Sequence, residues 1–339
     1  MKKILLFTMA ISITFVAMAQ NKKVALHHLG TTSLYSSNSG FADAITAAVN
    51  GDTIYLPGGY WNPPVSINKK LVIYGAGHYP DSTQATEGSH IVGTVTFEAG
   101  SDSTLFQGIE VSGDINFNGT PISYVHISRC AFGSSTHYGL TDHISYTECV
   151  VRGSLNPNNL ADFLHVRNSI IVNVIQNILQ GALIENNIFT YQNCCWYSAP
   201  TFAAVNGSLI RNNVILNTNI GYEIGGNCSN NLIQHNLFVT NPVASNNTLS
   251  GNYMGVASSS VFVNFPAFNV FNYSDDYHLQ SPATYLGTDG SELGIYGGSS
   301  PAKEAAVPAN PHIRINNTAQ STDVNGNLQI DIQVGAQDH

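Results

Sequence analysis

The sequence from Leu183 to Phe189 reads LIENNIF, and the pattern returns as LIRNNVI (residues 209–215) and LIQHNLF (residues 232–238). Each copy places apolar residues on both sides of a small polar pair. Self-similarity at a fixed period is the signature of a solenoid, in which each repeat is one turn of a coil. The repeat therefore predicts an all-β protein built as a single-stranded parallel β-helix.

When the turns are aligned on Asn187, three sets of equivalent positions stand out. Each set, here called a column, contains one residue from every turn. The reference column has spacings of 16 to 26 residues and consists of Gly108, Cys130, Cys149, Ser169, Asn187, Asn213, Asn236 and Asn252. Apolar residues occupy the positions three before it and one after it in nearly every turn. Because strand residues alternate between two faces, we interpret both apolar columns as the interior stack, separated by a tight corner. The reference residues would form an Asn ladder, with amides hydrogen-bonded along the stack.

Both ends of such a coil need a cover, because an open stack of strands recruits other strands. Residues 41–49 carry apolar side chains at helical spacing, which predicts a short helix that closes the first turn. Residues 51–61 (GDTIYLPGGYW) and 71–77 (LVIYGAG) follow it. This opening resembles that of the pectin-lyase-like right-handed parallel β-helix superfamily. The resemblance spans about residues 40 to 260 and implies a right-handed coil, but the fold hosts lyases, hydrolases, adhesins and passive surface proteins, so it defines no activity.

The chain divides into three expected parts. Residues 1–19 have the order of a secretory signal peptide, with Lys2 and Lys3 before an apolar run that ends in small residues. Residues 20–272 would form the β-helix with its N-terminal cap. Residues 273–339 would form a closing segment and a tail packed on the coil.

The tail has a pattern and a reason to pack. Residues 276–298 look like the closing segment of many exported bacterial β-helix proteins, and residues 328–334 alternate as one β-strand. Leu183, Leu209 and Leu232 form an outward apolar row in successive turns. Because an outward apolar row of this length usually has a cover, we expect the tail to lie over it.

Charge and composition narrow the function classes. Without Lys2 and Lys3, ten basic residues face 21 acidic ones, a net charge near −11. This charge argues against nucleic acid or an anionic membrane as a partner. Past the leader, no stretch approaches the roughly 20 apolar residues that span a bilayer. We therefore expect a protein that is secreted, periplasmic or at the cell surface, without membrane insertion.

The enzymes of the resembled superfamily supply two tests. Its lyases generally use a Lys or Arg base and often calcium, and this chain has no lysine between Lys70 and Lys303. Its galacturonan hydrolases carry adjacent aspartates, Gly-His-Gly and Arg-x-Lys on neighbouring turns. The adjacent pair Asp275 and Asp276 lies past the last clear turn, and the other two motifs do not occur in the sequence. Both enzyme classes are disfavoured.

One group of residues could still carry catalysis. Asp142 and Asp162 align in register, which should place their side chains on one face about 5 Å apart. Two carboxylates at such a short distance must share a proton, face solvent or bind a cation. Calcium is therefore a candidate cofactor, with these two residues as ligands. With His165 and Arg167 they would form the catalytic site of a polysaccharide lyase or retaining glycoside hydrolase acting on a uronate-containing glycan.

Nearby residues in register extend this group. His126, Arg129 and Glu148 are candidates for binding. The structural interpretation is the stronger one, because an Asp before a strand commonly caps a turn. Likewise Arg167 shares its column with Glu185 of the next turn, as in a solvated ion-pair ladder.

Residues 191–197 (YQNCCWY) interrupt the repeat and lengthen one turn to 26 residues. Insertions into solenoid turns emerge as loops, often on the binding face. Trp196 and Tyr197 would then stack on sugar rings. A loop tucked over the leucine row is an equally good interpretation.

Five cysteines are an odd number, so at least one thiol is unpaired within one chain. They are Cys130, Cys149, Cys194, Cys195 and Cys228. Cys130 and Cys149 occupy one column, which favours two stacked inward residues over a disulfide.

These observations favour an exported β-helix protein that contacts polysaccharide at the cell exterior, without strong catalysis. A lyase or hydrolase centred on Asp142 and Asp162 is the alternative from another class. A purely structural surface protein with the same fold is the third. Convergence of the two aspartates in an open groove would favour the enzyme, and exposure of Trp196 and Tyr197 would favour the binder.

Overall fold

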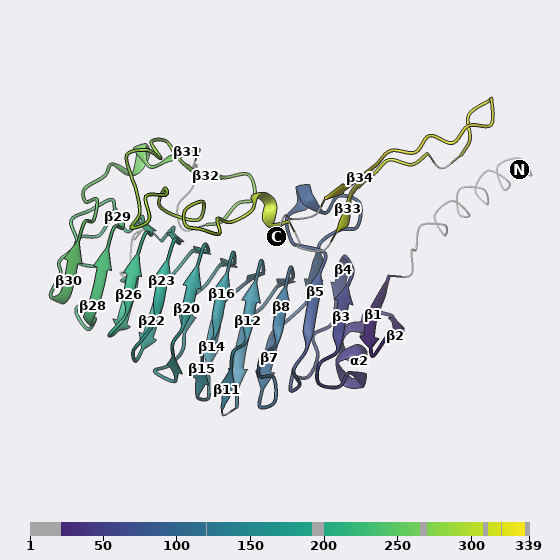
Figure 1. Ribbon diagram of the computed structural model, residues 1–339, viewed down its shortest axis with the longest axis horizontal. Coiled ribbons are helices and arrows are strands. Elements are labelled where there is room, and N and C mark those ends of the chain that lie inside the picture. Colours follow the sequence, from purple (N-terminus) through teal and green to yellow (C-terminus); the bar gives the residue numbers. More distant parts are fainter. Residues whose placement is uncertain are drawn as a thin grey trace, which may run out of the picture.

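The computed structural model describes residues 22–119, 121–191, 200–264, 270–307, 311–319 and 321–335. The chain forms a rod of stacked turns that runs from β1 at one end to β30 at the other (Figure 1). Sheet A has twelve strands, of which all but β1 and β2 run parallel. Its parallel strands are β3 (Thr53–Leu56), β5 (Val72–Gly75), β8 (Leu105–Gln107), β12 (His126–Ser128), β16 (Ser145–Thr147), β20 (His165–Arg167), β23 (Leu183–Glu185), β26 (Leu209–Arg211), β28 (Ser229–Gln234) and β30 (Asn246–Ser250). The predicted parallel β-helix is confirmed.

Three further sheets complete each turn. Sheet B has nine strands: β4 (Gly59–Trp61), β6 (Ser89–Ile91), β9 (Glu110–Val111), β13 (Ala131–Phe132), β17 (Val150–Val151), β21 (Ile170–Ile171), β24 (Ile188–Phe189), β27 (Val214–Ile215) and β29 (Leu237–Phe238). Sheet C has six: β7 (Val95–Glu98), β10 (Ile115–Asn118), β14 (Ser135–His137), β18 (Leu155–Asn156), β22 (Ile175–Ile178) and β25 (Phe202–Val205). Sheet D is short and holds β11 (Ile122–Ser123), β15 (Thr141–Asp142) and β19 (Ala161–Asp162).

The corner between sheets A and B turns on one left-handed residue. In the middle turns φ is 50° at Arg129, 54° at Glu148, 47° at Asn168, 56° at Asn186, 58° at Asn212 and 50° at His235. Asn tolerates this conformation, and glycine adopts it freely. Gly108 (φ 72°) is therefore the corner residue of its turn, as the pairing of Leu105 with His126 also shows. The predicted alignment of that turn is wrong by one residue, and Ile109 takes the place in the reference column that we gave to Gly108.

The Asn ladder is confirmed. Asn187 donates its backbone N–H and its side-chain amide to Asn213 Oδ1, at 2.9 and 3.0 Å. Asn213 does the same to Asn236, and Asn236 to Asn252. A second ladder, which the sequence analysis missed, joins Ser208, Asn231 and Asn247 at the corner before sheet A.

The interior stack differs from the prediction on sheet B. The column three before the reference is buried inside the coil, as expected, with Ile127, Ile184 and Ile210 fully enclosed. The column one after the reference faces outward instead, and the next residue of each strand, such as Phe132 or Phe189, fills the interior. The reason is strand alternation: the reference side chain points inward, so its successor points out.

The N-terminal end is closed by a helix and a hairpin. Helix α2 (Gly40–Ala47) buries Phe41, Ala44 and Ile45, so the predicted capping helix is confirmed. Strands β1 (Lys23–His28) and β2 (Thr31–Ser36) pair antiparallel, and β1 continues onto β3.

The C-terminal segment, residues 270–306, runs back along the outer face of sheet B (Figure 1). Residues 258–306 include η2 (Ser258–Ser260), β31 (Phe262–Asn264), β32 (Asp276–Leu279) and η3 (Glu304–Ala306). The segment buries the outward sheet B column and leaves the leucine row open, with Leu232 39% exposed. The expected cover over the leucines is therefore wrong, because the C-terminal segment packs instead on the outward apolar residues of sheet B, from Ile170 to Leu237.

Beyond it, β33 (His312–Asn316) and β34 (Ile332–Gly335) form an antiparallel hairpin that extends away from the rod (Figure 1). The strand predicted at residues 328–334 overlaps β34. In the described part of the chain, no helix has the length and apolar character needed to cross a membrane.

Candidate functional site

The outward column of sheet B changes chemistry along the rod. It reads Tyr60, His90, Glu110, Ala131, Val150, Ile170, Ile188, Val214 and Leu237 in successive turns. The C-terminal segment packs on the apolar part with Tyr277, Leu279, Leu293 and Ile295. The cover stops near the polar part, and the cavities described below lie at this boundary.

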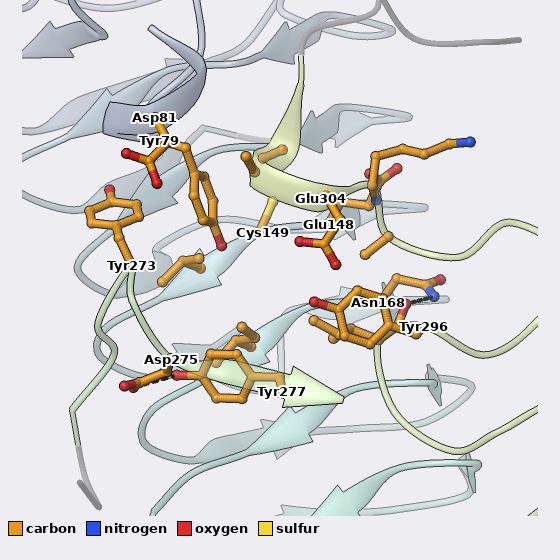
Figure 2. A pocket seen from close by; sticks show the side chains of 17 residues that line it. Tyr79, Asp81, Glu148, Cys149, Asn168, Tyr273, Asp275, Tyr277, Tyr296 and Glu304 are labelled. Atoms are coloured by element: carbon orange, nitrogen blue, oxygen red, sulfur yellow. Dashed lines mark hydrogen bonds between the residues drawn. The ribbon is translucent and has the colours of Figure 1, made fainter. Parts of the chain in front are cut away.

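The first cavity, here called the tyrosine pocket, encloses about 140 Å³ (Figure 2). Its polar lining includes four tyrosines and four carboxylates, together with Asn168 and Lys303; the tyrosines and carboxylates are Tyr79, Tyr273, Tyr277, Tyr296, Asp81, Glu148, Asp275 and Glu304. They come from the loop around η1 (Pro80–Ser82), from the corner of sheet A and from the C-terminal segment. At about 30 Å³ per water molecule, the space suits a ligand the size of a single sugar ring.

Two of the carboxylates are fixed by neighbours. Glu148 accepts hydrogen bonds from Arg129 at 3.1 and 3.2 Å and from the backbone N–H of Lys303 at 3.2 Å. Asp275 Oδ2 accepts hydrogen bonds from the Tyr277 hydroxyl and the Asn272 side chain, both at 3.3 Å. Asp275 Oδ1 is enclosed and has no hydrogen-bond partner among the described residues.

The tyrosines keep their protons. Burial, together with neighbouring negative groups, raises the pKa of Tyr277 and Tyr296 far above the ordinary value, and burial raises the pKa of Tyr273 to about 12. Tyr79 and Tyr273 lie edge to face, with ring centroids 4.7 Å apart. The pocket thus offers flat rings and neutral hydroxyls in fixed positions, a combination suited to a polar ring-shaped ligand.

The predicted catalytic residues are only partly brought together. Asp142 and Asp162 pair in register on sheet D, as expected, and His143 Nδ1 lies 2.7 Å from Asp142 Oδ1. His165 contacts Glu185 Oε1 at 3.1 Å, whereas Arg167 donates a long hydrogen bond of 3.4 Å to Thr147. Among the described contacts, no hydrogen bond or ion pair links the aspartates to His165 or Arg167.

The aspartate pair does not make a metal centre by itself. No group of three or more His, Cys, Asp or Glu side chains that could hold a metal ion is found among the residues that the structure describes. Calcium takes six to eight oxygen ligands, and Asp142 and Asp162 would have to share it with water or a ligand.

The predicted binding residues separate. Glu148 lines the tyrosine pocket, and Arg129 holds it in place. His126 is hydrogen-bonded to Ser145, and burial, with help from Arg167, lowers the pKa of His126 to about 4. Trp196 and Tyr197 lie outside the described residues.

The thiols in the described part of the chain are inert. Cys130, Cys149 and Cys228 are buried and unpaired, so the interpretation of the first two as stacked inward residues is confirmed. Burial raises the pKa of Cys130 to about 12. Cys194 and Cys195 lie outside the described residues.

The sequence analysis missed most of the pocket. Tyr273, Tyr277 and Tyr296 lie far from the repeats and reach the site only because the C-terminal segment returns along sheet B, where they join Tyr79 from the loop around η1. The available signal was the change from polar to apolar residues in the outward column, which becomes visible only once that column is recognised as outward.

Fold and pocket together define the chain as a parallel β-helix protein with a covered sheet and a polar pocket at the edge of the cover. Residues 163–295 match the model of a protein family described as disaggregatase related. The match includes the distal turns and most of the C-terminal segment, with Tyr273, Asp275 and Tyr277. Neither the curated proteins nor the solved structures contain a significant match to this chain.

Proposed function

We propose that this chain is an exported, pectin-lyase-like β-helix protein that binds a polysaccharide at the cell exterior, and that the tyrosine pocket holds one of its sugar rings. The observation that carries the proposal is a partly open cavity lined by four neutral tyrosines and by Asp275, whose Oδ1 is buried and unpartnered. Aromatic rings stack on the apolar faces of sugars, and a fixed carboxylate accepts hydrogen bonds from their hydroxyls.

The charge of the pocket favours an uncharged sugar. Of the four lining carboxylates, Glu148 is matched by Arg129, and Lys303 is the one cation in the lining. Placing a uronate carboxylate in this space would add a further negative charge at short range. The lining therefore supports a neutral glycan over a uronate-containing one.

Binding, rather than turnover, agrees with the arrangement of the pocket. A general base must reach the reacting proton and have a pKa near the working pH. Buried tyrosines with raised pKa values are poor bases at neutral pH. Their chemistry is that of hydrogen-bond donors.

The test is a binding screen of residues 20–339 against neutral and acidic oligosaccharides by isothermal titration. We expect a neutral glycan to bind and Asp275→Asn, which keeps the shape but weakens the acceptor, to reduce its affinity about tenfold, or 1.4 kcal/mol. Tyr138→Ala is the matched surface control, because this tyrosine is 62% exposed and does not line the pocket.

Two results would contradict the proposal. One is the absence of binding to any glycan of the screen. The other is tight binding that Asp275→Asn and Tyr138→Ala affect equally. If the protein released reducing ends or unsaturated uronates from a glycan, and Asp162→Asn abolished that release, the function would be catalysis on sheet D and not binding.

A further inference from the structure

A second cavity adjoins the tyrosine pocket at the polar end of the sheet B column. This histidine cavity encloses about 400 Å³ and is lined by Tyr60, His78, Pro80, Thr83, Gln84, Glu87, Gly88, His90, Glu110 and Tyr273. Tyr273 lines both cavities, and the consecutive residues His78 and Tyr79 line one each. The two cavities are therefore neighbouring compartments separated by the ring of Tyr273.

A chain of hydrogen bonds fixes the wall between them. Glu110 binds Arg152 at 2.6 Å, and Arg152 donates a hydrogen bond to the Tyr273 hydroxyl at 3.3 Å. The same hydroxyl lies 3.1 Å from His78 Nδ1. Arg can only donate, so the hydroxyl accepts from Arg152, and we assign its own hydrogen to Nδ1 of His78. This assignment makes Nδ1 the unprotonated nitrogen of His78 and places the ring proton on Nε2.

The Nε2–H group of His78 is buried without a partner. The residue is 2% exposed, and Nε2 makes no hydrogen bond to any described residue. Burial lowers the pKa of His78 to about 3, so the ring is neutral at ordinary pH. An orphaned buried donor is costly, and a ligand acceptor in the cavity would satisfy it.

The charges of the cavity select a neutral acceptor. Glu110 is matched by Arg152 and His90, and Glu87 is matched by Lys22 at 2.6 Å. No unpaired cation is left among the residues lining the cavity to hold a carboxylate or sulfate. The polar groups that remain are uncharged: the buried, unpartnered Nε2 of His78 and the side chains of Tyr60, Thr83 and Gln84.

The remaining lining is partly apolar. The Tyr60 ring stacks on His90 with centroids 4.9 Å apart, and Pro80 and Thr83 add carbon atoms to the wall. A carbonyl oxygen with a methyl group beside it matches a buried uncharged donor within such a wall.

We propose that the histidine cavity is a second sugar subsite, which recognises the acetamido group of an N-acetylhexosamine through His78 Nε2–H. The inference rests on the proposed function, because the sugar in this cavity is the neighbour, on the same chain, of the sugar in the tyrosine pocket. The Tyr273 hydroxyl positions His78 for this contact.

The test compares chitotetraose with cellotetraose, which have the same linkage and differ in the acetamido group. We expect wild-type protein to bind chitotetraose at least tenfold more tightly. His78→Leu should abolish this preference, and His78→Gln, which retains an N–H donor, should keep part of it. The melting temperature of each variant shows whether it is folded. In wild-type protein, ¹H–¹⁵N spectra of the histidine rings should show the His78 Nε2 resonance shifting when chitotetraose is added.

The outcomes separate this inference from the proposed function. Equal affinity for the two tetrasaccharides, still weakened by Asp275→Asn, would overturn the acetamido subsite and leave the glycan-binding function intact. An unchanged His78 resonance on saturation with chitotetraose would overturn it too, even if the His78 variants fail to fold. Absence of binding to every glycan tested would overturn both.

Discussion

Replacing Asn213 by alanine should destabilise the rod more than any surface substitution. Asn213 is fully buried, and its side chain makes four hydrogen bonds. Its Oδ1 accepts from the backbone and side-chain N–H groups of Asn187 at 2.9 and 3.0 Å, and its Nδ2 donates to Ile184 O and Asn236 Oδ1, both at 2.9 Å.

The magnitude follows from the groups left behind. In Asn213→Ala the backbone N–H of Asn187 loses its acceptor and the carbonyl of Ile184 loses a donor. Each buried group left without a partner costs about 1–3 kcal/mol. We therefore expect the free energy of unfolding to fall by about 4 kcal/mol, the middle of the resulting range.

Urea unfolding followed by circular dichroism measures this loss. Asn118→Ala is the matched control, because Asn118 is exposed on β10, and it should change the free energy by no more than about 0.5 kcal/mol. Amide hydrogen exchange gives a local readout, since the Asn187 N–H should lose protection in Asn213→Ala. A loss within about 1 kcal/mol of the control, with unchanged exchange at Asn187, would refute the reasoning that the ladder stabilises the coil.

Three further predictions concern charged and thiol groups. Hydrogen bonding and charge from His90 and Arg152 outweigh the opposing effect of burial and lower the pKa of Glu110 from 4.5 to about 2. Glu110→Gln should therefore lower the free energy of unfolding by about 2 kcal/mol at pH 7. The difference between variant and wild type, measured from urea midpoints, should disappear as the pH falls from 4.5 to about 2. A difference that stays constant over this pH range would contradict the prediction. Asp162→Asn should stabilise the protein by about 0.5 kcal/mol, because the repulsion between this side chain and Asp142 is lost. If millimolar calcium raises the melting temperature of the wild-type protein but not of the variant, the two aspartates form a calcium site instead. In a variant that lacks Cys194 and Cys195, Ellman's reagent should detect no thiol before unfolding, because the three remaining thiols are buried; rapid labelling of the native state would contradict their placement.

The repeat predicted the coil because a parallel stack imposes the same demand on every turn. Asn187, Asn213 and Asn236 each accept a hydrogen bond from a backbone N–H of the preceding turn, so the same residue recurs and the pattern can be recognised in the sequence. The alignment was wrong at Gly108 because a glycine can occupy either the left-handed corner position or the small polar position that follows it. The sequence contains no local sign that separates these two uses.

The outward column on sheet B was hidden for a related reason. Ile170, Ile188 and Val214 are as apolar as interior residues, since the C-terminal segment buries them on the outside. Periodicity reports burial and does not report which side of the strand is buried. The candidate site was missed with it, because Tyr273 and Tyr277 reach the coil through a segment that has no repeat.

The position of the cavities follows from where the cover can end. An apolar column needs a cover, and the segment packs on it from Leu237 back to Ile170. At Glu110 the column becomes charged, and a close-packed cover there would bury the Glu110–Arg152 pair at a high desolvation cost. At this point the segment contacts the coil through Tyr273, whose hydroxyl accepts a hydrogen bond from Arg152 at 3.3 Å, and a cavity lies on each side of that tyrosine. The switch from apolar to polar residues along one column thus coincides with the end of the close-packed cover and with the position of both cavities.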